Sequence, residues 1–170
     1  MAMVRGSPNP LHFRLAARLK MARKQSKLTR MALGERAAVS DATVRHIETD
    51  QRLPAVGTVA RIAAALGISP AWLAYGYGEP TEHASAATCE GMGERLLSIR
   101  TDRDLTKAAL ARQTELSAGA ILGIENGGQA GVDTVERIAK ALGISPAWLA
   151  YGIGPQVLPS RRRSRPAAAV

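Results

Sequence analysis

Cysteine, aromatic residues and long hydrophobic runs are scarce in this chain of 170 residues. The single cysteine, Cys89, excludes an internal disulfide framework and any zinc site built from several cysteines. No apolar run approaches the roughly 18 residues that a membrane-spanning helix needs. Residues 1–13 hold no continuous apolar stretch like that of a secretory signal peptide. We therefore expect a soluble protein of a reducing compartment.

Aromatic residues make up only 4% of the chain, although hydrophobic residues as a whole reach 46%. Packed cores must therefore consist mainly of alanine, leucine, isoleucine and valine. The length allows one domain of ordinary size or two small ones.

Basic residues are concentrated in one segment and one tail. The chain has a net charge of +9, and residues 11–78 carry eleven basic and four acidic side chains. Residues 91–154 carry seven of each sign, whereas the tail 155–170 adds four arginines. This uneven distribution predicts a localised anion-binding surface rather than solvated lysines spread over the whole protein.

The chain contains an internal duplication. Residues 59–78 recur as 135–154 with 17 of 20 positions identical, at an offset of 76. The similarity continues upstream at an offset of 77, which aligns Ile47-Glu48 with Ile124-Glu125. A period this long predicts two tandem small domains rather than a solenoid. We place an N-terminal tail at 1–10, domains at 11–78 and 91–154, a polar linker at 79–90 and a basic, disordered tail at 155–170.

Each copy shows helical periodicity throughout and no alternation long enough for a strand. In the first copy we expect a helix over about 11–25, and Thr29 and Ser40 as N-caps of the next two helices. Thr58 is expected to open the fourth helix, which Gly67 ends, and Ser69-Pro70 to open a fifth helix that ends at Gly76. The predicted second, third and fourth helices cover about 30–37, 41–48 and 58–66.

The stretch LTRMALGERAAVSDATVRHIETDQRLP at 28–54 resembles the helix-turn-helix core of the Xre family, the λ-repressor- and Cro-like DNA-binding domains. The second copy resembles it too, and keeps Ile124-Glu125-Asn126-Gly127. Both copies depart from the pattern at the turn, where Ala38 and Glu115 replace the common glycine, and the first copy has Thr49-Asp50 in place of Asn-Gly. The resemblance implies an all-α fold of two tandem five-helix domains joined by a short linker.

The resemblance places the recognition helix of the first copy at 41–48, since the major groove of DNA admits one α-helix. Arg45 can donate two hydrogen bonds to guanine, or can instead pair with Asp41 on its own helix. Asp41 could instead stabilise the positive end of the helix dipole, and His46 could be a solvent-exposed helix residue rather than a base contact. The expected base contacts are Asp41, Ala42, Thr43, Arg45 and His46, and the expected phosphate contacts are Lys24, Lys27, Arg30, Ser40, Thr49 and Arg52.

Other residues of the repeat favour structural roles. Glu48 and Glu125 are expected to accept hydrogen bonds near a helix end. Trp72, Tyr75, Trp148 and Tyr151 could stack on single-stranded bases, but their identical settings on short amphipathic helices favour core or interface packing.

The second copy offers few hydrogen-bond donors to DNA. Leu122 and Gly123 align with Arg45 and His46, and the domain is neutral. We expect it to serve in dimerisation or partner binding, or to lie on DNA as a shape-tolerant clamp. The candidate contacts of this copy are Lys107, Arg112, Ser117, Leu122 and Asn126.

The resemblance implies a sequence-specific transcriptional regulator, expected to be a repressor, in the cytoplasm of a bacterium or in phage-infected cells. We expect double-stranded DNA as partner, with a homodimer on an inverted repeat, and no cofactor, metal or membrane. The alternative is a protein-interaction module, such as an antitoxin or phage adaptor, that acts through the second domain. Catalysis is not expected, because His12, His46 and His83 are scattered. The arginines of the tail either improve solubility or reach DNA.

Overall fold

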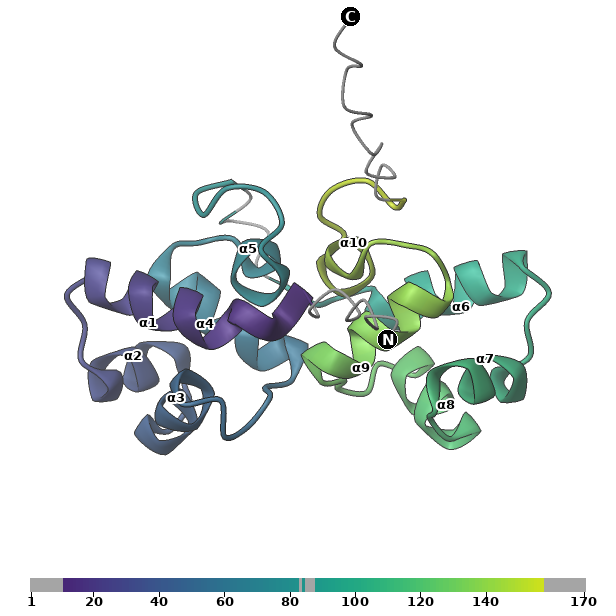
Figure 1. Cartoon of the computed structure of the whole chain (residues 1–170), viewed down its shortest axis with the longest axis horizontal. Helices are drawn as coiled ribbons and strands as arrows, with labels where there is room; N and C mark the ends of the chain where they lie inside the picture. Colours follow the sequence, from purple (N-terminus) through teal and green to yellow (C-terminus); the bar gives the residue numbers. More distant parts are fainter. Residues whose placement is uncertain (1–10, 83, 85–87, 158–170) are drawn as a thin grey trace, which may run out of the picture.

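The computed structural model describes residues 11–82, 84 and 88–157, which form two copies of one helical unit side by side (Figure 1). The N-terminal tail 1–10 and residues 158–170 of the predicted basic tail lie outside the described residues, as do 83 and 85–87 of the predicted linker.

Every described helix has a counterpart in the other copy, apart from a short 3-10 turn at the start. The first copy comprises η1 (Leu11–Arg14), α1 (Leu15–Gln25), α2 (Arg30–Ala37), α3 (Asp41–Glu48), α4 (Val56–Leu66) and α5 (Pro70–Tyr75). The second comprises α6 (Met92–Asp102), α7 (Lys107–Thr114), α8 (Ala118–Glu125), α9 (Val132–Ala141) and α10 (Pro146–Tyr151). The prediction of five short helices per copy in an all-α fold is therefore confirmed.

Local capping signals predicted the bounds of α2, α3 and α5. The Thr29 side chain accepts a hydrogen bond from the Ala32 amide, and Ser40 caps α3 in the same way. Ser69 caps α5, which Pro70 opens and the left-handed Gly76 ends.

Two predicted helix starts were wrong, and contacts between the copies explain both. The fourth helix begins at Val56 rather than at Thr58, because the Val56 amide donates to the Ala130 carbonyl of the other copy at 2.9 Å. The first predicted helix begins as the 3-10 turn η1, whose Leu11 and His12 amides donate to the Glu136 carboxylate on α9. Such long-range partners leave no periodic signal in the sequence.

The buried side chains of the two copies form one continuous and mainly aliphatic core, as the low aromatic content requires. The fully buried side chains occur in aligned pairs: Leu19 and Leu96, Leu33 and Leu110, Val44 and Ile121, Ile62 and Ile138, Leu73 and Leu149. Arg18 and Arg95 make equivalent contacts in the two copies. Nε of Arg18 donates to the Leu73 carbonyl at 2.9 Å, and Nε of Arg95 donates to the Leu149 carbonyl at 3.0 Å.

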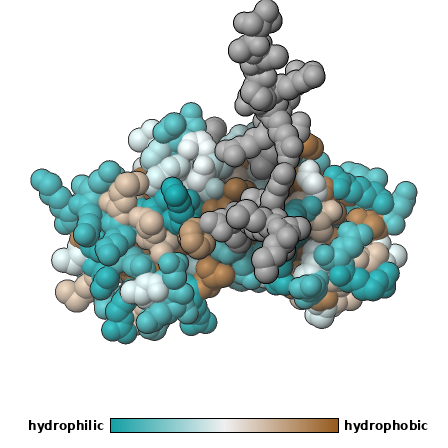
Figure 2. Space-filling view, in the orientation of Figure 1, coloured by the Kyte–Doolittle hydropathy of each residue, from teal (hydrophilic) through white to brown (hydrophobic). Residues whose placement is uncertain are grey.

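The two copies pack against each other through the α5 and α10 ends and the loops that precede α4 and α9. Tyr75 and Tyr151 are buried at this junction, whereas Trp72 and Trp148 are half-buried beside the core. The predicted packing role of these aromatic residues is therefore confirmed. On the face drawn in Figure 2, hydrophobic side chains gather near the middle of the molecule, and the part of the first copy that holds α3 is largely hydrophilic.

Within the described ranges, no helix is both long and apolar enough to cross a bilayer.

Candidate nucleic-acid interface

The helices α2 and α3 form a tight bihelical unit. Gly34 permits their close approach, since a Cβ atom at this position would lie 2.8 Å from the Val39 carbonyl oxygen. Between the helices, Ala38 adopts a left-handed conformation with φ of 51°. This conformation is unfavourable for a residue that has a Cβ atom. Alanine in place of the common turn glycine therefore strains this turn.

The outer surface of α3 presents the predicted base contacts. Asp41 and Arg45 are exposed, while Ala42, Thr43 and His46 are half-buried along the same helix. Val44 and Ile47 point inward and are buried, as predicted. Within the described chain, Asp41 and Arg45 form no ion pair, so the Arg45 guanidinium stays available to a ligand.

A buried carboxylate fixes the far end of α3 to the rest of the copy. Glu48, whose side chain is fully shielded, accepts hydrogen bonds from Nε of Arg23 at 2.6 Å and from Nε of Arg30 at 2.7 Å. Burial alone raises the pKa of Glu48, but the hydrogen bonds and charges of the two arginines lower it below its ordinary value. The carboxylate is therefore ionised and ties α1, α2 and α3 together, which confirms its predicted structural role.

This contact revises the role expected for Arg30. Its Nε is committed to Glu48, whereas its terminal nitrogen atoms make no hydrogen bond to the described protein. Arg30 can therefore still meet a phosphate, but from a side chain whose position Glu48 sets.

Thr49 also differs from expectation. Its hydroxyl donates to the Arg45 carbonyl at 2.9 Å, so the hydroxyl proton is not free for a phosphate in this conformation.

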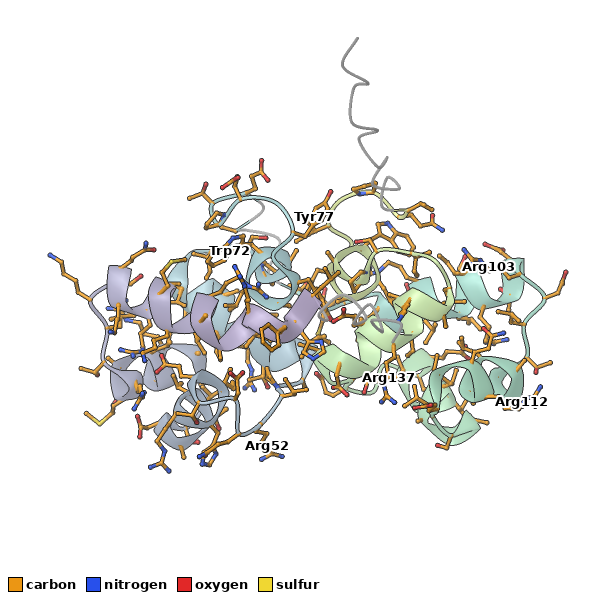
Figure 3. The ribbon with its side chains drawn as sticks, in the orientation of Figure 1. Arg52, Trp72, Tyr77, Arg103, Arg112 and Arg137 are labelled. Atoms are coloured by element: carbon orange, nitrogen blue, oxygen red, sulfur yellow. The ribbon has the colours of Figure 1, made fainter. Side chains whose placement is uncertain are left out.

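The remaining predicted phosphate contacts are Lys24, Lys27, Arg52 and Ser40. Lys24, Lys27 and Arg52 are exposed, and Arg52 projects from the same edge of the molecule as α3 (Figure 3). Ser40 caps α3 by accepting from the Thr43 amide at 3.0 Å and lies 2.8 Å from the Thr43 hydroxyl, which leaves the Asp41 and Ala42 amides outside the intrahelical hydrogen bonds. These groups give the edge several donors suited to an anion.

A hollow of about 430 Å3 adjoins α3 at the loop that leads to α4. Thr43 and Arg52 line it together with Thr58, which lies within α4 instead of capping it. The sequence predicts a start of α4 at Thr58, two residues too late, and does not predict this neighbourhood.

The second copy repeats the internal contacts of the first. Glu125 accepts from Nε of Arg100 at 2.5 Å, and Lys107 lies 3.7 Å from it in the position of Arg30. Arg100 also donates to the Leu105 carbonyl, as Arg23 does to Leu28. Glu115 is left-handed at the turn with φ of 54°, like Ala38. The scaffold of the helix-turn-helix is therefore present twice.

The outer surface of α8 has none of the polar side chains of α3. Leu122 replaces Arg45 and is 44% exposed, and Gly119 and Gly123 replace Ala42 and His46. No heavy atom lies within 4 Å of a Cβ built on Gly123, and one built on Gly119 makes only an ordinary contact. Packing within the chain therefore does not require glycine at either position.

The other candidate contacts of the second copy lie around α8. Ser117 caps the helix by accepting from the Ala120 amide at 3.0 Å, and Asn126 is exposed after its end. Lys107 is partly engaged by Glu125, whereas Arg112 is exposed toward the outer end of the copy (Figure 3).

The charge difference between the copies follows aligned positions. Five basic residues around α1, α2 and α3 correspond to one basic residue in the second copy. Lys24, Lys27, Arg30, Arg36 and Arg45 align with Thr101, Asp104, Lys107, Gln113 and Leu122. At these five positions the basic side chains belong mainly to the first copy, whereas Arg103 and Arg112 of the second copy align with Ser26 and Glu35.

The two helix-turn-helix units face the same way. In Figure 1, α3 and α8 lie on the same edge of the molecule, one toward each end, with α5 and α10 on the opposite edge. The sequence predicts core or interface packing for Tyr75 and Tyr151, but not this pairing of the copies within one chain.

Comparisons with known proteins agree with this geometry. Residues 14–74 match a family described as helix-turn-helix domain, and residues 96–149 match one described as helix-turn-helix. The chain is similar to the HTH-type transcriptional regulator PrtR of Pseudomonas aeruginosa, at 34% identity over 112 residues. That similarity covers 62% of this chain and 43% of PrtR, so the chain spans less than half the length of this relative. No solved structure matches the chain significantly. The chain belongs to the Xre-type helix-turn-helix family of DNA-binding regulators and carries two such domains in tandem.

Proposed function

We propose that the protein is a sequence-specific, double-stranded DNA-binding regulator of transcription that inserts α3 into the major groove. The observation that carries this proposal is the exposed Arg45, which has no ion-pair partner among the described residues, on a helix held by the buried Arg23–Glu48–Arg30 cluster. Base contacts require such a fixed platform, because a bidentate hydrogen bond tolerates little displacement.

The side chains of α3 suit the edges of base pairs. The guanidinium of Arg45 can donate to O6 and N7 of guanine, and Asp41 can accept from N4 of cytosine. The Thr43 and Ala42 methyl groups can contact a thymine methyl, and His46 extends the polar surface by one turn. Each of these pairings is a proposal about one residue and can be tested separately.

Phosphate contacts supply most of the affinity in this scheme. Lys24 and Lys27 precede α2, Arg30 lies within it, and Arg52 follows α3, so cations occur both before and after the recognition helix along the chain. The amides at the Ser40 end of α3 add donors for a phosphate oxygen. Release of counterions from DNA then drives binding and makes it depend steeply on salt.

Regulation in this scheme requires no catalysed reaction. A protein bound at a promoter excludes other proteins from that DNA, so repression by occupancy is the outcome that we propose. The similarity to a transcriptional regulator supports this assignment.

The experiment begins with selection of bound duplexes from a random pool by the full chain. Affinities for the selected site are then measured by fluorescence anisotropy for the protein, for Arg45→Ala, and for the matched variant Leu122→Ala at the aligned position. We expect Arg45→Ala to weaken binding by about 5- to 150-fold, which corresponds to 1–3 kcal/mol. Leu122→Ala should change the affinity by less than about threefold.

Because Arg45 is exposed and pairs with no described residue, its truncation should leave the unfolding temperature unchanged, and circular dichroism checks this. Selection of no sequence at all, or equal affinities of Arg45→Ala and the unsubstituted chain, would overturn the proposal.

A further inference from the structure

We propose that a single chain occupies a complete, asymmetric DNA site, with base discrimination in the half that meets α3 and almost none in the half that meets α8. This inference rests on the proposed function and specifies its DNA substrate. It differs from the homodimer on an inverted repeat that the sequence suggests, because the pairing of two helix-turn-helix units is already complete within the chain.

Reciprocal backbone contacts join the two copies. The Val56 amide donates to the Ala130 carbonyl at 2.9 Å, and the Val132 amide donates to the Pro54 carbonyl at 3.0 Å. Val56 and Val132 align in the repeat and are both fully buried. Each copy therefore offers the same loop to the other, which is the self-complementary arrangement of a two-fold dimer.

Two buried tyrosines repeat this reciprocity. The Tyr75 hydroxyl donates to the Val132 carbonyl, and the Tyr151 hydroxyl donates to the Val56 carbonyl, each at 3.2 Å. Burial raises the pKa of both phenols well above the ordinary value, so both remain protonated donors. These groups are enclosed at the junction and are not accessible to a second chain.

Contacts without a counterpart across the junction strengthen the pairing. The Tyr77 ring lies over Gly154, where any Cβ atom would overlap it. His12 lies 2.5 Å from the Glu136 carboxylate, so η1 of the first copy is fixed to α9 of the second. The surfaces that the two copies present at this junction are therefore occupied within the chain and cannot join a second chain.

The resulting geometry suits one duplex. Paired helix-turn-helix units bind half-sites separated by about 34 Å, one turn of DNA. With α3 and α8 on one edge of the molecule (Figure 1), a duplex lying along that edge meets both helices.

The chemistry of the two helices makes such a site asymmetric. The outer positions of α8 carry Ala118, Gly119, Ala120, Leu122 and Gly123, none of which has a hydrogen-bonding side chain. Cations near α8 are few, and Lys107 is partly engaged by Glu125. The second copy therefore has little means of distinguishing one base pair from another.

The first test determines stoichiometry and site symmetry together. Native mass spectrometry of the full chain on its selected duplex should find one 18.0 kDa chain per duplex. The selected sequences should agree in one half only, while hydroxyl-radical footprinting should show protection in two segments about one helical turn apart.

The second test restores the chemistry of α3 to α8. The variant carries A118D, G119A, A120T, L122R and G123H, and leaves the buried Ile121 and Ile124 unchanged. We expect it to select an inverted repeat, still as one chain per duplex. The matched control, G119A with G123A, adds side chains without polar groups and should still select an asymmetric site; circular dichroism verifies that both variants fold.

The outcomes separate this inference from the proposed function. Two chains per duplex on an inverted repeat would overturn the inference and leave the proposed function intact. Selected sequences that agree in both halves with one chain per duplex would also overturn the inference. So would a footprint that protects one half only, which would indicate that the second copy binds another partner. Absence of any sequence preference would overturn the proposed function itself.

Discussion

Arg23 and Arg100 occupy aligned positions in the two copies and make the same contacts, whereas Arg45 and Leu122 are also aligned but have different chemistry. Each inner arginine donates to a buried glutamate and to a backbone carbonyl five residues further along the chain. The outer residues differ in charge and in hydrogen-bonding capacity. One set of residues thus maintains the helix-turn-helix scaffold, and a different set carries the binding role that we propose, so each set can be altered without the other.

The largest expected effect concerns the buried glutamates. Glu48→Ala leaves the Arg23 guanidinium without its carboxylate, and loss of one partner of a buried pair costs about 3 kcal/mol. Glu125→Ala should cost somewhat less, because Lys107 lies farther from Glu125 than Arg30 lies from Glu48. Urea unfolding measures both losses, and Glu35→Ala on the exposed surface of α2 is the control, with an expected change within about 0.5 kcal/mol. Equal behaviour of Glu48→Ala and Glu35→Ala would show that the cluster does not stabilise the copy.

The same cluster predicts that the free energy of unfolding depends on pH. The arginines hold the pKa of Glu48 below its ordinary value of 4.5. A depressed pKa stabilises the fold fully above pH 4.5, and this stabilisation is lost as the pH falls through the folded-state pKa. Unfolding free energies measured from pH 6 to pH 3 should therefore fall less steeply in Glu48→Gln than in the unsubstituted chain. A fall of the same steepness would assign the acid sensitivity to other groups.

Exchange of aligned charged residues tests whether the first copy contributes more to DNA affinity than the second. Lys24→Thr with Lys27→Asp gives the first copy the residues of Thr101 and Asp104. We expect affinity for the selected site to fall on the order of tenfold, and the slope of log K against log salt to fall by about two. Both Lys27 and Asp104 are left-handed, with φ of 54° and 52°, so the exchange preserves the backbone.

The reciprocal variant, Thr101→Lys with Asp104→Lys, should raise affinity without changing sequence preference. A change in the selected bases in either variant would mean that these residues contact more than phosphates.

The junction tyrosines allow a smaller, symmetric test. Tyr75→Phe and Tyr151→Phe each remove one buried hydroxyl donor, and we expect each to cost about 1 kcal/mol of unfolding free energy. Because the two contacts are equivalent, the two losses should agree within the error of thermal unfolding. A marked inequality would show that the copies do not meet symmetrically.

The smallest effect is a gain in stability at the turns. Ala38 and Glu115 are left-handed, so Ala38→Gly and Glu115→Gly relieve backbone strain and should each stabilise the protein by about 1 kcal/mol. The increase in thermal unfolding temperature should be similar in both copies. A loss of stability in either variant would contradict the assignment of strain to that turn.

Local signals explain how much of this fold could be predicted from the sequence. The bounds of α2 and α3 followed from Thr29 and Ser40, because a cap and the helix it opens are only a few residues apart. The start of α4 was missed because it depends on Ala130, which is distant in sequence. The engagement of Arg30 by Glu48 was missed for the same reason, since the pair is separated by a turn and a helix.

From the sequence, the candidate site could be predicted only in the types of its residues and in which of them are exposed. The exposure of Arg45 and Leu122 followed from the helical pattern around the buried Val44 and Ile121. The common orientation of α3 and α8 could not, because it depends on how Tyr75 and Tyr151 pair the two copies. Specificity for particular bases depends on a complex with DNA.

The most direct test of the division between the copies is to scramble one half of the selected site at a time and measure the affinity of the unsubstituted chain for each duplex. We predict a loss of about 100-fold or more when the half that meets α3 is scrambled, and a loss within about threefold for the other half. Losses of equal size in both halves, or no loss in either, would contradict the account.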